Sequence, residues 1–188
     1  LDKFKIEIVP DANNTFVRLS QGSLDLADRV RPTDYIEFSK TTESVRAVDA
    51  GPGLSIDHMW FNLNVAADGK PVAGDIKYSW FNDKRFRQAI SMAIDRRSIT
   101  SITLQGLASP LYGFVSPANK VWIAPELPKI ELSIEKASQL LKDAGFQKGG
   151  SGGSPVLTDA KGNPVEFSLI FPAENEARKL MASVIQED

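Results

Sequence analysis

One segment, residues 83–95, constrains the fold more than any other part of the chain. Asn82 or Asp83 stands at its start and suits the N-cap of a helix. Apolar residues then recur at intervals of three and four, which places them on one helix face: Phe86, Ala89, Ile90, Ala93 and Ile94. Asp95 is placed to cap the next helix. A stripe of this kind needs cover, so the segment predicts a helix packed inside a layered domain.

Strand-like and helix-like patterns mingle along the whole chain, without repeats. Helices are predicted from Asn13 or Asn14 to Gly22 and over 32–40, 83–94, 95–106, 133–145 and 174–188. Strands are predicted over 3–9, 24–27, 44–48, 56–65 and 165–171, and residues 66–77 are expected to form a loop. This mixture indicates an α/β or α+β domain. We expect the α/β form, a mixed sheet flanked by helices.

The segment 56–65 is the most informative of the expected strands. Alternate residues on one face are apolar and indicate core: Met59, Phe61, Leu63 and Val65. The opposite face is polar and aromatic: His58, Trp60, Asn62 and Asn64. Such a mixture is found both on solvated sheet faces and in pockets, so the alternation leaves the role of this second face open.

Charge and composition exclude several classes of function. The 22 basic and 24 acidic residues leave a net charge of -2, so no strong field attracts nucleic acid. Cysteine is absent and His58 is the single histidine, which leaves little room for a metal site. No phosphate-binding glycine loop or nucleophile elbow occurs in a suitable context. The sequence therefore predicts no cofactor, no metal and no catalytic machinery.

The ends of the chain and one internal stretch bear on its organisation. The chain begins at Leu1, inside a strand-like pattern and without an initiator Met, and it ends at Asp188 without a helix C-cap. We therefore expect a fragment of a longer, exported protein. Residues 149–154, Gly-Gly-Ser-Gly-Gly-Ser, have the composition of a flexible loop. This loop is either natural or an engineered join, and the hairpin-like turn at 159–163 favours a natural loop.

Five short stretches, taken in order, resemble one known family. They are the start of the chain (8–11 and 19–27), the Phe61-Asn62 pair, the helix 81–96, the group Gly106, Pro110 and Tyr112-Gly113, and Ala137 to Gly145. The helix reads Phe-Asn-Asp-Lys-Arg-Phe-Arg-Gln-Ala-Ile-Ser-Met-Ala-Ile-Asp-Arg. The series resembles the second lobe of family 5 extracellular solute-binding proteins, the dipeptide- and oligopeptide-binding group, and it extends over essentially the whole chain.

The resemblance implies both a fold and a function. It implies that residues 1–188 are a partial second lobe of a two-lobed, type II periplasmic-binding-protein-like fold. Such proteins hold a ligand in the cleft between lobes, close about a hinge and dock on a membrane permease. The expected function is therefore capture of a peptide or similar small solute for an ABC importer, without chemistry on the ligand. The expected protein is an exported monomer, periplasmic or extracellular and membrane-anchored.

Candidate ligand-binding residues follow from the resemblance and from the polar face of 56–65. Asn62 is the first candidate, followed by Trp60, Tyr112, Phe171 and Asn175. Some relatives have an arginine for the ligand carboxylate near the turn where this chain reads Phe171-Pro172-Ala173. An equally simple interpretation gives all five residues surface or packing roles.

Other interpretations stay open on sequence alone. The aromatic residues outside the helix stripe could stack on a ligand, although most aromatic residues are core: Trp60, Trp80, Trp122, Tyr112 and Phe114. His58 could act as a base in a small hydrolase if a serine and an acid lay nearby, although a lone histidine more often has a structural role. A sensory or interaction module built on the same lobe is a further alternative.

Overall fold

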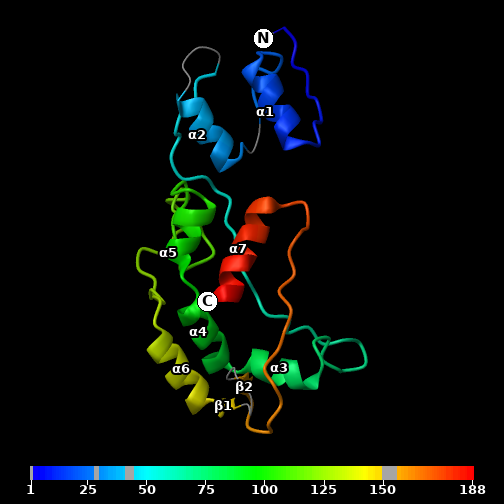
Figure 1. Cartoon of the computed structure of the whole chain (residues 1–188), viewed down its shortest axis with the longest axis vertical. Coiled ribbons are helices and arrows are strands. Elements are labelled where there is room, and N and C mark those ends of the chain that lie inside the picture. Colours follow the sequence, from blue (N-terminus) through cyan, green and yellow to red (C-terminus); the bar gives the residue numbers. More distant parts are fainter. Residues whose placement is uncertain (1, 28–29, 41–44, 150–155) are drawn as a thin grey trace. The chain divides into compact units, whose positions relative to one another are not determined.

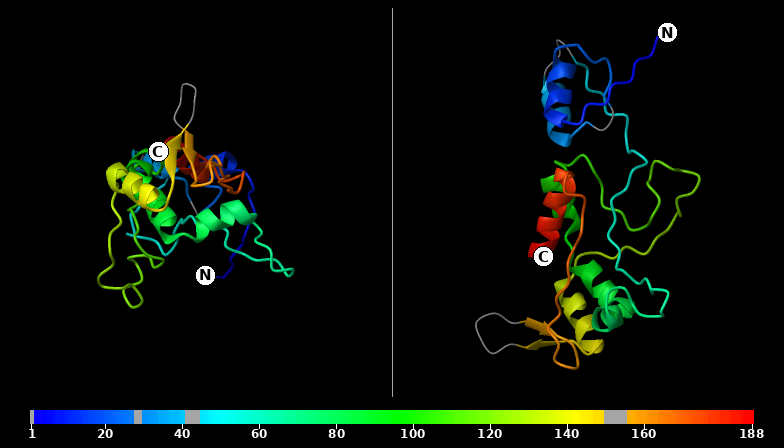
Figure 2. Two further views of the ribbon diagram at one scale, coloured as in Figure 1. Left: turned by 90° about the horizontal axis from the view of Figure 1, so that it is seen from below. Right: turned by 90° about the vertical axis from the view of Figure 1, so that its right-hand side faces the viewer.

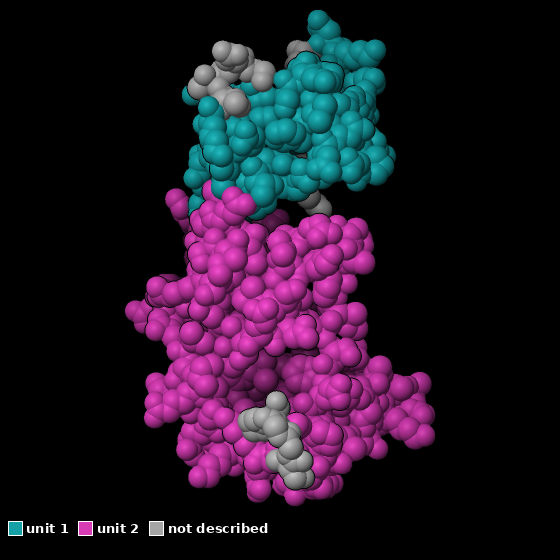
Figure 3. Space-filling model, in the orientation of Figure 1, with its two compact units in different colours: residues 1–53 teal, residues 54–188 magenta. Residues whose placement is uncertain are grey.

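The computed structural model describes residues 2–27, 30–40, 45–149 and 156–188 (Figure 1). The chain divides into two compact units, Leu1–Gly53 and Leu54–Asp188 (Figure 3). No helix in the described part is both long and apolar enough to cross a bilayer.

The first unit contains a pair of helices, α1 (Ala12–Ser20) and α2 (Pro32–Lys40). The Asp11 carboxylate caps α1 by accepting a hydrogen bond from the backbone N–H of Asn14 at 2.7 Å. The helices are held together by Phe16 and Phe38, whose rings stack with centroids 4.8 Å apart. Both helices begin and end close to their predicted limits.

The second unit contains the remaining elements (Figure 2). These are α3 (Asp75–Asn82), α4 (Lys84–Ala93), α5 (Arg96–Ser98), the π-helix η1 (Ile99–Thr103), α6 (Ile134–Asp143), β1 (Gln147–Gly149), β2 (Val156–Thr158) and α7 (Glu176–Glu187). Helix α4 packs against α6, and α7 packs against η1. Helix α3 begins inside the expected loop 66–77, which is a correction to the sequence prediction.

Three predicted caps are confirmed at atomic detail, whereas α1 is capped by Asp11 and not by Asn13 or Asn14 as predicted. Asp83, not Asn82, caps α4 by accepting from the backbone N–H of Arg85 at 2.8 Å. Asp95 caps α5 by accepting from the backbone N–H groups of Arg97 and Ser98 at 2.9 and 3.0 Å. Ser133 caps α6 in the same way. These short side chains satisfy N–H groups that no earlier turn of the helix can reach.

An aromatic core lies at the centre of the second unit. Phe86 is 0% exposed, and it clusters with Trp80, Phe81 and Phe146. The rings of Phe86 and Phe146 lie 5.2 Å apart. Phe61 and Phe167 pack against this cluster. Of the stripe predicted for the 83–95 segment, Phe86, Ala89 and Ile94 are buried and Ile90 and Ala93 are partly buried. Phe86 contacts rings from four other segments.

The strand predictions are wrong in position. The described residues carry one small sheet, in which β1 and β2 pair antiparallel with Lys148 opposite Leu157, in place of the larger mixed sheet expected. Segments 3–9, 24–27, 45–48 and 165–171 are irregular, and 56–65 carries only an isolated bridge between Val65 and Pro71. Residue 44 and residues 150–154 of the expected Gly/Ser loop lie outside the described residues.

The reason for this error is physical. Alternation of apolar and polar residues records which side of a segment needs cover, whereas a strand also needs a neighbour to satisfy its backbone groups. The first property holds only in the first part of 56–65, where Phe61 packs inward and Trp60 is 73% exposed. Leu63 and Val65, which the alternation predicts to face the core, are 38% and 51% exposed, so that part of the prediction is wrong. Among the described residues, 56–65 has no neighbouring strand, and its ladder is limited to the bridge between Val65 and Pro71.

Candidate functional site

The segment 57–62 separates the core of the second unit from an exposed surface. Phe61 contacts the core rings of Phe81 and Phe86, with centroids 5.0 and 5.9 Å away. Asp57 holds the start of the segment through an ion pair with Arg178 of α7, in which the Arg178 Nε to Asp57 Oδ1 distance is 2.8 Å. Packing of Phe61 thus anchors the segment in the core, and the exposed ion pair adds a contact between the segment and α7.

Two exposed rings of this segment, those of His58 and Trp60, lie next to the exposed ring of Phe114. We call these three residues the aromatic patch. The His58 ring lies 5.0 Å from that of Trp60 and 5.6 Å from that of Phe114, the latter edge-on at 81°. Trp60 is 73% exposed and Phe114 is 77% exposed. Rings from two distant parts of the sequence therefore meet in solvent.

The structure places the five predicted site residues in different settings. Trp60 lies in the aromatic patch. Asn62 is exposed two residues further on, and its side-chain oxygen accepts from the backbone N–H of Asn64 at 3.0 Å. Tyr112 is half-buried, and Phe171 is 37% exposed. Asn175 has a structural contact of its own, since it caps α7 by accepting from the backbone N–H of Arg178 at 3.0 Å.

These five residues do not all converge. The ion pair between Asp57 and Arg178 brings the start of α7, where Asn175 lies, to the segment that carries Trp60 and Asn62. Within the described residues, no ring contact joins any two of the five. Trp60 is a site residue predicted from the sequence, whereas Phe114 is one of several aromatic residues whose role the sequence leaves open. The missing information was the return of the 108–128 loop to His58, which no local pattern encodes.

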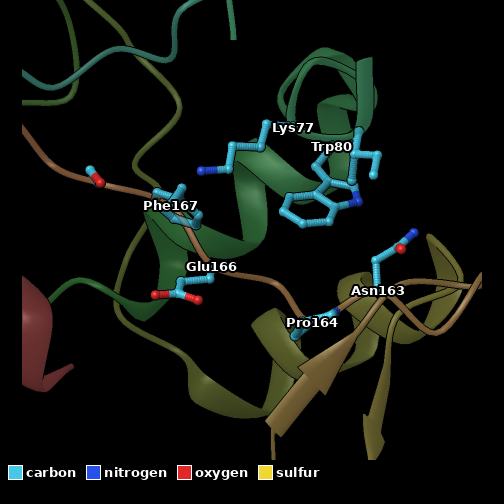
Figure 4. Close-up of a pocket in the computed structure, with 8 residues that line it drawn as sticks. Lys77, Trp80, Asn163, Pro164, Glu166 and Phe167 are labelled. Atoms are coloured by element: carbon cyan, nitrogen blue, oxygen red, sulfur yellow. The ribbon is translucent and has the colours of Figure 1, made fainter. Parts of the chain in front are cut away.

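A shallow, open hollow of about 330 Å³ lies elsewhere on the second unit (Figure 4). Trp80 and Phe167, both part of the aromatic core or packed on it, form its apolar wall. Lys77 and Glu166 also line it, and neither makes an ion pair with any described residue. Trp80 is one of the aromatic residues whose role the sequence leaves open, whereas none of the five candidate ligand-binding residues lines this hollow.

Asp159 stabilises the turn at 159–163, whose end lines the hollow through Asn163. Its carboxylate accepts from the Asn163 side chain at 2.9 Å, from the backbone N–H groups of Lys161 and Asn163 at 2.9 Å each, and from the Trp80 indole N–H at 3.1 Å. The hydrogen bond from the Asn163 side chain, followed by those from the Asn163 backbone and Trp80, lowers the pKa of Asp159 to about 2. This carboxylate therefore fixes the turn and Trp80 together.

His58 lacks the surroundings of a catalytic base. No hydroxyl or carboxylate in the described part of the chain hydrogen-bonds to it, and its ring neighbours are Trp60 and Phe114. Nor do the described residues gather three or more His, Cys, Asp or Glu side chains in a group suited to a metal ion. Among the described residues, the contacts of the His58 ring are therefore aromatic.

Comparison with known sequences places the chain in a family. The model of the bacterial extracellular solute-binding proteins, family 5, middle region, matches residues 1–188. A probable ABC transporter-binding protein of Deinococcus radiodurans is 33% identical over 193 residues, which cover all of this chain and 31% of that protein. The oligopeptide-binding protein AppA of Bacillus subtilis is 30% identical over 190 residues, which cover all of this chain and 31% of AppA.

A solved structure agrees with these matches. The structure of AppA from Bacillus subtilis in complex with a nonapeptide superposes with a TM-score of 0.64 at 28% identity, over 96% of this chain and 32% of that one. The match confirms the expected fold class, one lobe of a type II periplasmic-binding-protein fold, even though the expected strands are irregular here. The chain spans about a third of the length of these relatives. It belongs to family 5 of the bacterial extracellular solute-binding proteins.

Proposed function

We propose that this chain is part of the substrate-binding component of an ABC importer, which captures a peptide or similar small solute between two lobes and delivers it to a permease. The observation that carries the proposal is the family match over residues 1–188. The relatives named as an ABC transporter-binding protein and an oligopeptide-binding protein support it. The protein would be exported, acting in the periplasm or outside the cell as a membrane-anchored monomer.

The surface of the second unit is compatible with this role. A solute enclosed between lobes is bound by burial of its apolar groups and by hydrogen bonds to its polar groups. The aromatic patch and the neighbouring Asn62 present both kinds of group to solvent. A cleft-forming lobe is expected to hold such groups in position before the solute arrives, because preorganisation lowers the entropic cost of binding.

Binding without chemistry is the part of the proposal that separates it from a hydrolase. Calorimetric titration of the whole protein that carries this chain, against peptides of two to nine residues, should show saturable binding. Chromatography of the same mixtures should recover every peptide intact. Cleavage that is abolished by His58→Ala would overturn the proposal in favour of an enzyme.

Import itself is tested in the host. Deleting the gene should abolish uptake of the peptide that the purified protein binds, and restoring it should restore uptake. Unchanged uptake in the deletion strain would contradict an import role and would favour a sensory module built on the same lobe.

A further inference from the structure

We draw no further inference here: the strongest candidate, the open hollow on the second unit between α3 and the 163–168 segment, presents Lys77 and Glu166 beside the rings of Trp80 and Phe167, but nothing in the structure shows what covers or occupies it.

Discussion

The aromatic core and the aromatic patch are both built from aromatic side chains, but the core rings are buried and the patch rings are exposed. The two regions meet at the consecutive residues Trp60 and Phe61. Phe61 turns inward to rings contributed by α3, α4 and the 165–171 segment, whereas Trp60 turns outward to His58 and Phe114. Ring chemistry does not distinguish the two sets. Burial does, because a ring covered on all sides stabilises the fold, while an exposed ring is free to bind something else.

The two regions also differ in how many segments hold them together. Phe86 is 0% exposed and lies within about 6 Å of three other rings from distant segments. The patch joins two segments only. We therefore expect substitutions in the core to change the free energy of unfolding, and substitutions in the patch to change binding.

The largest effect is expected from Phe86→Ala. Removing a fully buried ring should lower the free energy of unfolding by about 3–5 kcal/mol, because both burial and packing are lost. Phe114→Ala is the control in the exposed region and should cost less than about 0.5 kcal/mol. Urea denaturation of the whole protein measures both. Equal losses for the two variants would break the distinction between core and patch.

A smaller loss of stability is expected when the N-cap of α4, the helix that carries Phe86, is removed. Asp83→Ala removes the acceptor for the Arg85 N–H at the start of α4 and should lower stability by about 1 kcal/mol. Asp83→Asn keeps a capping side chain and should retain most of that stability. If Ala and Asn at this position give the same denaturation midpoint, α4 is held by packing alone.

Acid should weaken the core through Asp159. The pKa of this carboxyl is about 2 in the folded protein against an ordinary 3.8, so the stability it contributes is present above about pH 3.8 and is lost as the pH falls towards 2. Melting temperature should therefore decline over this window, and less steeply in Asp159→Asn than in the unsubstituted protein. Asp68→Asn is the control, because the Asp68 carboxylate contacts Lys70 within its own turn. If melting temperature falls with pH at the same rate in all three proteins, Asp159 does not contribute to the loss of stability in acid.

The smallest effect on stability is expected from Trp60→Ala. Its ring is mostly exposed, so the free energy of unfolding should change by less than about 0.5 kcal/mol. The same substitution at Phe61 removes a ring packed on Phe81 and Phe86 and should cost several times more. Denaturation of this pair of variants compares two neighbouring residues directly, and a reversed order would contradict the assignment of faces.

Local signals predicted the helices well and the strands poorly. Asp83, Asp95 and Ser133 act within three residues of their own position, so their caps were visible in the sequence. The inward direction of Phe61 and the outward direction of Trp60 were also visible, from alternation. Pairing of strands depends on a second segment, and so does the meeting of His58 with Phe114 across more than fifty residues. For that reason Trp60 could be singled out from the sequence, whereas its meeting with Phe114 through His58 could not.

The central claim is that a captured solute covers Trp60. Acrylamide quenching of tryptophan fluorescence tests it directly, in the whole protein and in Trp60→Phe, because the difference between the two reports Trp60 alone. We expect this difference to be large without peptide and to fall sharply when a bound peptide saturates the protein. A difference that stays the same at saturation would contradict it.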